Sequence, residues 1–371
     1  MASLFTSVYP GGHGVKHGIA MDGAIHGQEL LDDSFLTLAE VLRSRGYKTF
    51  GISSNAHMSR DTGMAQGFDN FTSFWFYESA PVHQAAVELT EQIEEAKPWF
   101  LWIHYFDPHS PYQPRKPWID SYAKHPEYID EFGNKHIEWL REQQPRIEGN
   151  RDILQTLIDL YDSEINYTDD FVRRLFSEVL PPGNTLIVIS ADHGEAFLDH
   201  GFLGHAKTLF QEEIRVPLII VPPGATTAQS RRSGHEVSII DIYPTILDYA
   251  GIKPPTQCRG RSLRSVVEGG IPEPGRPVFA EFDRGVPQQS VILDGWKLTV
   301  CGTEQARVLA NLAADPGETQ NLASSELAMT KRLNDEMERW RAHTPLFTAP
   351  RGEVRLTPKQ EELMKSLGYL R

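Results

Sequence analysis

Hydrophobic and polar positions follow two alternating patterns over the first two thirds of the chain. Short apolar runs that are typical of strands occur at residues 47–53, 99–105, 185–189 and 216–221. Between them, apolar residues recur at helical spacing at residues 34–45, 81–96 and 153–175. Alternation of this kind predicts a parallel sheet covered by helices. We therefore predict an α/β fold with a mostly parallel central sheet flanked by helices, spanning residues 1–265.

The pattern changes after residue 254, where proline, glycine and arginine are dense up to residue 277. Beyond this boundary we expect short strands at 278–282, 290–293 and 296–300, a turn at Asp315-Pro-Gly317 and a helix near 327–340. Residues 275–371 are thus predicted to form a small C-terminal α+β subdomain. Residues 114–150 show little periodicity, and we interpret them as a long surface insertion of the kind that often serves as a lid.

Composition and charge narrow the range of binding partners that the chain can have. The 371 residues are 40% hydrophobic and carry a formal net charge of −14, which argues against binding to a nucleic-acid backbone. No window approaches the roughly 18 apolar residues of a membrane span, and the first residues lack the order of a secretory signal, so we expect a soluble, cytoplasmic chain with no membrane partner. Cys258 and Cys301 are too few for a disulfide framework or structural zinc.

The run at 185–189 leads directly into Ser190-Ala-Asp-His-Gly-Glu195, and we read it as a strand buried on both faces of the parallel sheet. Ligands of α/β folds gather at the carboxyl ends of such strands. Asp192 and His193 supply a carboxylate and an imidazole that one turn can aim at a single metal ion. The alternative is a polar turn in which Asp192 caps the next helix.

A glycine-rich segment places His205 thirteen residues after Asp192. His205 could donate a hydrogen bond to a leaving oxygen or bind an anionic oxygen, although it could also be a surface histidine, and Lys207 could fill the role instead. His109 lies between Pro108 and Pro111, just past the strand at 99–105.

Asn55 and His57 follow the strand at 47–53 in the same way. Like His109, each could be structural rather than catalytic. Because every candidate follows a strand at its carboxyl end, we expect them to meet at one edge of the sheet.

At this point the chain resembles the sulfatases of the alkaline-phosphatase superfamily nearly end to end. The resemblance is carried by Ala2-Ser-Leu-Phe-Thr-Ser-Val-Tyr-Pro10 with His13-Gly14, Leu38-Ala-Glu-Val-Leu42 with Gly46-Tyr47, Phe106-Asp-Pro-His-Ser-Pro-Tyr112, Tyr161-Asp-Ser-Glu-Ile165, Ser190-Ala-Asp-His-Gly-Glu195, Arg215-Val-Pro217, Asp241-Ile-Tyr-Pro-Thr245, Asp315-Pro-Gly-Glu318 with Asn321-Leu322, and Leu367-Gly-Tyr-Leu370.

The resemblance implies hydrolysis of a small-molecule or carbohydrate sulfate ester by a nucleophile beside one divalent cation. Calcium is the expected ion, with manganese, magnesium and zinc as alternatives. Asp192 and His193 match two metal ligands of the family. His205 stands at the position where the family has a Lys or His that contacts the substrate. His109 and His57 match pocket histidines, and a homo-oligomer would be compatible with the family.

Two departures from the family pattern matter. Many sulfatases have Lys at the position of Asn55. Relatives that cleave phosphate diesters and phosphonate monoesters show the same departure from Lys. The family's nucleophile, a Cys or Ser converted to formylglycine, and the paired acids that complete the metal shell precede the Ser-Leu-x-Thr segment. Aligning Ala2-Ser-Leu on that motif puts the nucleophile four residues before Met1.

We therefore expect an N-terminally truncated form. Either Met1 is an internal methionine of a longer, active protein, which we favour, or the frame is truly cut. Three functions follow as hypotheses: a sulfuric ester hydrolase, a phosphodiesterase or phosphonate monoester hydrolase of the same superfamily, and a non-catalytic scaffold that binds an anionic ligand.

Overall fold

The structure is a computed structural model of the 371-residue chain. It describes residues 1–17, 20–22, 25–75, 78–96, 98–180, 183–225, 230–271, 273–302, 306–354 and 357–366. The sequence motif Leu367-Gly-Tyr-Leu370 lies outside these residues.

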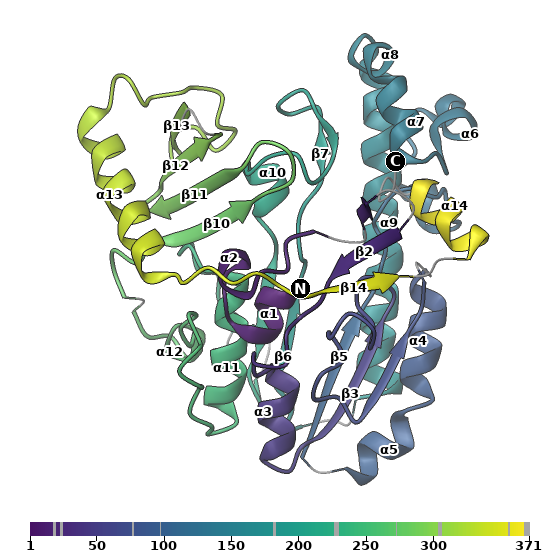
Figure 1. The fold of residues 1–371 in the computed structure, drawn as a ribbon. Coiled ribbons are helices and arrows are strands. Elements are labelled where there is room, and N and C mark those ends of the chain that lie inside the picture. The colour runs from purple at the N-terminus through teal and green to yellow at the C-terminus, as the bar shows by residue number, and fades with distance from the viewer. Residues whose placement is uncertain are drawn as a thin grey trace.

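A parallel three-stranded sheet lies in the first part of the chain, as predicted. Strand β3 (Lys48–Ser53) is central and pairs in parallel with β4 (Asn70–Ser73) and β5 (Trp99–His104) (Figure 1). All but the first residue of β3 are buried, because α3 (Leu38–Ser44) and α4 (Ser79–Val87) both pack against this strand. The helix predicted at 34–45 begins later than expected, because the Thr37 side chain accepts a hydrogen bond from the backbone of Glu40 and caps α3 at residue 38.

Strand β6 (Ile187–Ser190) differs from the prediction in its pairing. It forms an antiparallel pair with β9 (Leu218–Val221), and its residues are only half-buried, whereas we expected a strand buried on both faces of a parallel sheet. An apolar run records burial but not the direction of the neighbouring strand, so the sequence could not distinguish the two arrangements. The coarser prediction holds, since the chain mixes helices and strands and includes a parallel sheet.

The insertion at 114–150 is helical rather than a loop. It contains η1 (Trp118–Ser121), η2 (Pro126–Tyr128), α6 (Ile129–Phe132), α7 (Ile137–Glu142) and α8 (Gln144–Glu148). These short helices bury Ile119, Phe132, Leu140 and Ile147 against the long helix α9 (Arg151–Glu178). None of them exceeds six residues, which explains why no helical period was visible in the sequence. The structure does not test whether the insertion acts as a lid.

The C-terminal part contains the predicted strands and one that the sequence did not show. Strands β10 (Val278–Phe282), β11 (Gln288–Leu293) and β12 (Trp296–Cys301) form an antiparallel sheet that β13 (Ala306–Asn311) completes. Helix α13 (Leu327–His343) packs on this sheet and buries Leu333, Met337 and Trp340.

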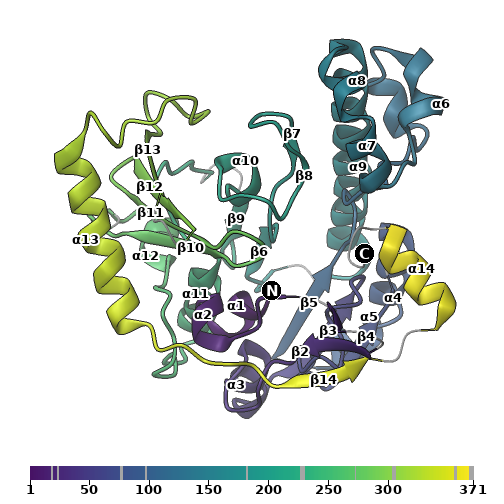
Figure 2. The same cartoon turned by 45° about the horizontal axis from the view of Figure 1, so that its top comes forward.

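The chain then returns to its beginning. Strand β14 (Arg351–Val354) pairs with β2 (Ile25–Glu29), so the end of the predicted C-terminal subdomain joins a sheet made with the first segment of the chain (Figures 1 and 2). The division at residues 265–275 itself stays a prediction.

The remaining elements connect these sheets. Their bounds are α1 (Ala2–Thr6), α2 (Pro10–His13), β1 (Ala20–Asp22), α5 (Thr90–Glu95), β7 (Ala196–Phe197), β8 (Leu203–Gly204), α10 (Gln211–Ile214), η4 (Ile239–Asp241), α11 (Ile242–Tyr249), α12 (Arg264–Val267) and α14 (Pro358–Ser366). Within the described ranges, none of the helices combines the length and the apolar character that crossing a bilayer requires.

Candidate active site

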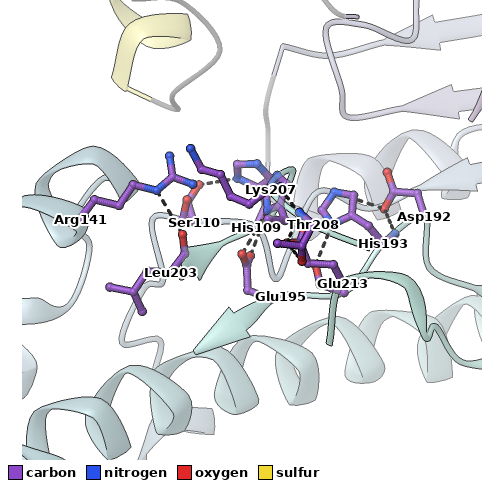
Figure 3. Close-up of polar contacts among 12 residues, drawn as sticks. His109, Ser110, Arg141, Asp192, His193, Glu195, Leu203, Lys207, Thr208 and Glu213 are labelled. Carbon is purple, nitrogen blue, oxygen red and sulfur yellow. Dashed lines mark hydrogen bonds and ion pairs between the residues drawn. The ribbon is translucent and has the colours of Figure 1, made fainter. Parts of the chain in front are cut away.

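Three histidines from separate segments come together. The ring centroids of His193 and His205 are 4.0 Å apart and stacked, and the ring of His109 meets that of His205 edge-on at 5.0 Å. His193 follows β6, His205 follows β8, and His109 follows β5. Figure 3 shows His109 and His193 in one region with Asp192 and Glu195. These three histidines, here called the histidine trio, therefore lie close together after the ends of three strands. Their catalytic roles stay predictions.

Asp192 and His193 present two ligands of different chemistry. The Nδ1 of His193 donates a hydrogen bond to the carbonyl oxygen of Gly194 at 2.8 Å, which leaves Nε2 with its lone pair. That Nε2 lies 3.9 Å from Oδ1 of Asp192. The pair fits a divalent cation, because a carboxylate oxygen and an imidazole nitrogen with the right tautomer face the same space. Among the described residues, no group of three or more His, Cys, Asp or Glu side chains is arranged to hold a metal ion, so this pair supplies part of a shell.

The charges around Asp192 favour its ionised form. Burial alone would raise its pKa, but His193 and then His104 hold the pKa of Asp192 below its usual value. Met1, Asp192, His193 and His205 line the same hollow, which has a volume of about 2420 Å³. The carboxylate is therefore available to a cation at neutral pH.

His205 is held as a cation by a buried acid. Its Nδ1 lies 3.1 Å from Oε1 of Glu195, whose side chain is only 4% exposed. Burial opposes the charge on His205, but the Glu195 carboxylate outweighs it, so the pKa of His205 lies above its usual value. The protonated ring can donate from Nε2 to an anionic oxygen.

His109 is the neutral member of the histidine trio. Its Nδ1 donates to the carbonyl oxygen of Ser110 at 2.6 Å, and its ring stacks on Phe106 at 4.4 Å. Burial first, and then the charge of His205, lower the pKa of His109 to about 3. With Nδ1 as the donor, its Nε2 is a proton acceptor at neutral pH.

The segment that follows His205 is anchored by Glu213. The Glu213 carboxylate accepts hydrogen bonds from the backbone nitrogens of Lys207 at 3.1 Å and Thr208 at 2.9 Å, and from the Thr208 hydroxyl at 2.8 Å. Only 4% of Glu213 is exposed, whereas Lys207 is exposed. The loop predicted between Gly194 and Gly204 thus contains the β7–β8 hairpin and is fixed on both sides of His205.

Gly194 is required by close packing. Its nitrogen donates to the carbonyl oxygen of Glu213 at 2.8 Å, and a Cβ at this position would lie 2.1 Å from the carbonyl oxygen of Glu212. No side chain larger than hydrogen fits there without a backbone shift. The Asp-His-Gly-Glu turn is therefore docked directly onto the α10 segment.

Asn55 and His57 lie at the end of β3, as predicted. The Asn55 side chain accepts a hydrogen bond from the backbone nitrogen of His57 at 2.9 Å, which closes a tight turn. Burial first, and then the charge of Arg284, lower the pKa of His57 to about 4. The structure thus gives His57 a charged neighbour from the predicted C-terminal subdomain.

Sequence reasoning missed several residues that shape the site. Glu195 and Glu213 were not assigned roles, although Glu195 belongs to the Asp-His-Gly-Glu motif. His104 was also missed. Its pKa is lowered by burial, against the charge of Asp192. His104 is the last residue of β5, whereas the predicted candidates come after the end of a strand.

Comparisons with known proteins agree with this arrangement of the fold. The family described as "Sulfatase" matches residues 1–252, which is more than half of the chain. The chain belongs to the sulfatase family. A second family description, "N-sulphoglucosamine sulphohydrolase, C-terminal", matches residues 199–343.

Two curated relatives illustrate the range of the family. This sulfatase-family chain is 29% identical over 270 residues to the multifunctional alkaline phosphatase superfamily protein PehA of Trinickia caryophylli, covering 62% of the chain and 52% of that protein. It is 29% identical over 255 residues to the choline-sulfatase of Rhizobium meliloti, covering 62% and 48%. The chain therefore spans about half the length of these relatives.

Solved structures share the fold. One is BT4656 in complex with its substrate D-glucosamine-2-N,6-O-disulfate, with a TM-score of 0.67, 18% identity, and coverage of 93% of this chain and 88% of that one. Another is the phosphonate monoester hydrolase of Silicibacter pomeroyi, with a TM-score of 0.64, 21% identity, and coverage of 94% and 86%. At this level of identity the likeness concerns the fold alone.

Proposed function

We propose that this chain is the larger part of a divalent-metal-dependent hydrolase of sulfate esters. The observation that carries the proposal is the placement of Asp192 and His193, with the tautomer of a metal ligand, directly beside the His205–Glu195 ion pair. Membership of the sulfatase family supports the same conclusion.

The residues have complementary roles in this proposal. The bound cation would activate the nucleophile and screen the charge of the ester. Asp192 and His193 would hold it. Protonated His205 donates a hydrogen bond to an anionic ester oxygen or to the leaving oxygen, and Glu195 keeps that proton in place. Neutral His109 accepts a proton at Nε2 from a hydroxyl group at the reacting centre. Asn55, His57 and Lys207 are proposed as further residues that bind the substrate.

The nucleophile is proposed to lie ahead of Met1, where the resemblance of the Ala2–Pro10 motif puts it. The N-terminus lies between β5 and β6 in both views, and Met1 lines the same hollow as Asp192 and His193 (Figures 1 and 2). A residue four positions earlier lies within about 14 Å of Met1, because a residue spans at most ~3.6 Å. In the described sheets β5 pairs only with β3 and β6 only with β9, so each offers one edge to a further strand.

The cation is proposed to be calcium, as the family resemblance implies. Manganese, magnesium and zinc are the alternatives, and the imidazole nitrogen of His193 is a donor that zinc accepts more readily than calcium does. The ester is proposed to be carried by a small molecule or a carbohydrate, in line with the disulfated glucosamine that the neighbour BT4656 binds.

The experiment that tests this function compares the chain with a longer version that includes the in-frame codons upstream of Met1. We expect the longer chain to hydrolyse 4-nitrophenyl sulfate in the presence of calcium, and we expect Asp192→Asn to reduce kcat by at least ~100-fold, which is about 2.7 kcal/mol of the barrier. The matched control is Asp33→Asn, because Asp33 is an exposed carboxylate in a turn before α3. No turnover by the longer chain with any of the four metals would favour the non-catalytic scaffold.

A second candidate function is hydrolysis of phosphate diesters or phosphonate monoesters. Asn55 favours it, because sulfatases often carry Lys at that position, and the likeness to PehA and to the phosphonate monoester hydrolase points the same way. Turnover of 4-nitrophenyl sulfate and of bis-4-nitrophenyl phosphate by the longer chain separates the two. A kcat/KM ratio that strongly favours the phosphate diester would reverse our ranking.

A further inference from the structure

Basic side chains line the hollow of the candidate site although the whole chain carries a net charge of −14. Four of the eight Lys and Arg side chains among them are neutralised in ion pairs. Lys16 pairs with Asp283 and Arg276 with Asp241. Arg284 is exposed and, in the part of the chain that the structure describes, forms no ion pair. Arg284 also lines the hollow, so its positive charge is accessible there.

The turn that carries Arg284 is tied down at both ends. It connects β10 and β11 over residues 283–287. At its start, the Asp283 carboxylate pairs with Lys16 at 2.7 Å, and the Asp283 carbonyl oxygen accepts a hydrogen bond from Nε2 of His17 at 3.0 Å. At its end, the Gln288 side chain accepts from the backbone nitrogen of Leu209 at 3.2 Å.

The same Gln288 side chain donates to the carbonyl oxygen of Lys207 at 3.1 Å. Gln288 is thus bonded on both sides of Thr208, in the segment that follows His205. The turn bridges the N-terminal segment and the His205 loop, so Arg284 is presented by a fixed backbone rather than by a free loop.

The charge of Arg284 also acts on His57, which follows the end of β3. It is the charged neighbour that helps burial to lower the pKa of His57. Arg284 lines the hollow together with Asp192, His193 and His205. A ligand whose ester group lies at Asp192 and His205 therefore has a guanidinium within the same hollow.

Other unpaired arginines lack this placement. Arg215, Arg231 and Arg232 also line the hollow and are exposed, with no ion pair to a described residue. Glu213 ties the segment of Arg215 to the His205 loop, as Gln288 ties the turn of Arg284. Arg284 differs from the other three in that its charge also acts on His57, which follows β3.

We propose that Arg284 binds a second anionic group of the substrate, so that the substrate carries at least one negative charge besides the ester that is cleaved, as a doubly sulfated or carboxylated saccharide does. A guanidinium suits this role because it binds a sulfate or carboxylate through two parallel hydrogen bonds. The proposal rests on the proposed function, and it names the class of substrate for the same site.

The test measures binding of two saccharides to the chain by isothermal titration calorimetry in calcium-containing buffer. The probes are N-acetylglucosamine 6-sulfate, with one anionic group, and D-glucosamine-2-N,6-O-disulfate, with two. We expect the disulfate to bind the wild-type chain about tenfold more tightly, equivalent to ~1.4 kcal/mol. Arg284→Gln should abolish that difference and leave the affinity for the monosulfate unchanged, and Arg284→Lys should retain part of it.

Arg45→Gln is the matched control, because Arg45 is an exposed arginine at the end of α3 and does not line the hollow. It should leave both affinities unchanged. Equal binding of the two saccharides to the wild type, or a difference that survives in Arg284→Gln, would overturn the inference and leave the proposed function standing. Failure of both saccharides to bind the wild type would overturn the inference, whereas the proposed function is decided by turnover of the longer chain.

Discussion

The ion pair between Lys297 and Glu318 links the C-terminal sheet to the His205 loop, and its removal gives the sharpest stability prediction. The two side chains are 1% and 2% exposed and lie 2.8 Å apart. Lys297 also donates to the carbonyl oxygen of Leu209, and Glu318 accepts from the backbone nitrogen of Gln211 at 2.7 Å. Burial lowers the pKa of Lys297, and the Glu318 carboxylate opposes that effect.

Replacing Lys297 with Met keeps the length of the side chain but removes its charge and its donors. The Glu318 carboxylate then stays buried without its cation, and the Leu209 carbonyl loses its partner. Removing one member of a buried pair costs about 3–5 kcal/mol. At about 2–4 °C per kcal/mol for a large domain, we expect Lys297→Met to lower the Tm by about 10 °C.

The assay is thermal unfolding followed by circular dichroism. Lys331→Met is the matched control, since Lys331 forms an exposed pair with Asp335 at 2.5 Å with side chains 78% and 44% exposed, and such a pair contributes under ~0.5 kcal/mol. Adding Glu318→Gln to Lys297→Met should recover part of the lost stability, because it removes the uncompensated charge and keeps an acceptor for Gln211. A Tm for Lys297→Met within about 1 °C of the wild type would refute the reasoning.

Two further predictions concern the site and its surroundings. Gly194→Ala should destabilise the chain by about 3 kcal/mol in thermal unfolding, because the new Cβ would lie 2.1 Å from the Glu212 carbonyl oxygen. The control Gly234→Ala should be neutral, because a Cβ there has no atom within 4 Å. Equal effects of both substitutions would contradict the packing argument. Burial first, and then the charge of Asp107, raise the pKa of the Glu164 carboxyl group. The folded chain therefore binds the proton of Glu164 more tightly than the unfolded chain does. The resulting stabilisation is complete below the ordinary pKa of Glu and is lost as the pH rises through the raised pKa. Wild type should therefore lose more Tm between pH 5 and pH 8 than Glu164→Gln does, and parallel curves for the two proteins would speak against it.

Elements with a strong period or clear end signals could be predicted from the sequence. The strand at 278–282 has the predicted bounds, the strands at 47–53 and 99–105 are within one residue, and α9 spans the predicted helical pattern. In each case apolar spacing and a glycine, proline or polar residue at the end act together. Burial against a neighbouring layer then follows from the pattern alone.

Pairing partners could not be predicted in the same way. The antiparallel pairing of β6 with β9 and of β14 with β2 joins segments far apart in the sequence, and nothing local encodes direction or partner. The short helices of the insertion were missed because four to six residues hold less than two helical turns. Their stability comes from packing on α9 rather than from local propensity.

The candidate site divides along the same line. Residues that follow strands, such as His109, Asp192 and His193, were found because the strand ends were visible. His205 was found through the motif and its glycines, but its partner Glu195 acquires its role only when the β7–β8 hairpin folds back. Arg284 comes from a turn more than 75 residues beyond His205, and only the folded chain brings it to the hollow.

The central claim is that Asp192 and His193 hold a divalent cation beside His205. The most direct measurement is calorimetric titration of the longer chain, which includes the in-frame codons upstream of Met1, with Ca²⁺, Mn²⁺, Mg²⁺ and Zn²⁺, repeated for Asp192→Asn, His193→Gln and the control Asp33→Asn in the same chain. The account predicts saturable binding of one ion per chain, weakened at least tenfold by each of the first two substitutions and unchanged by the third. Binding that is equal in all four proteins, or absent from the wild type with every ion, would contradict it.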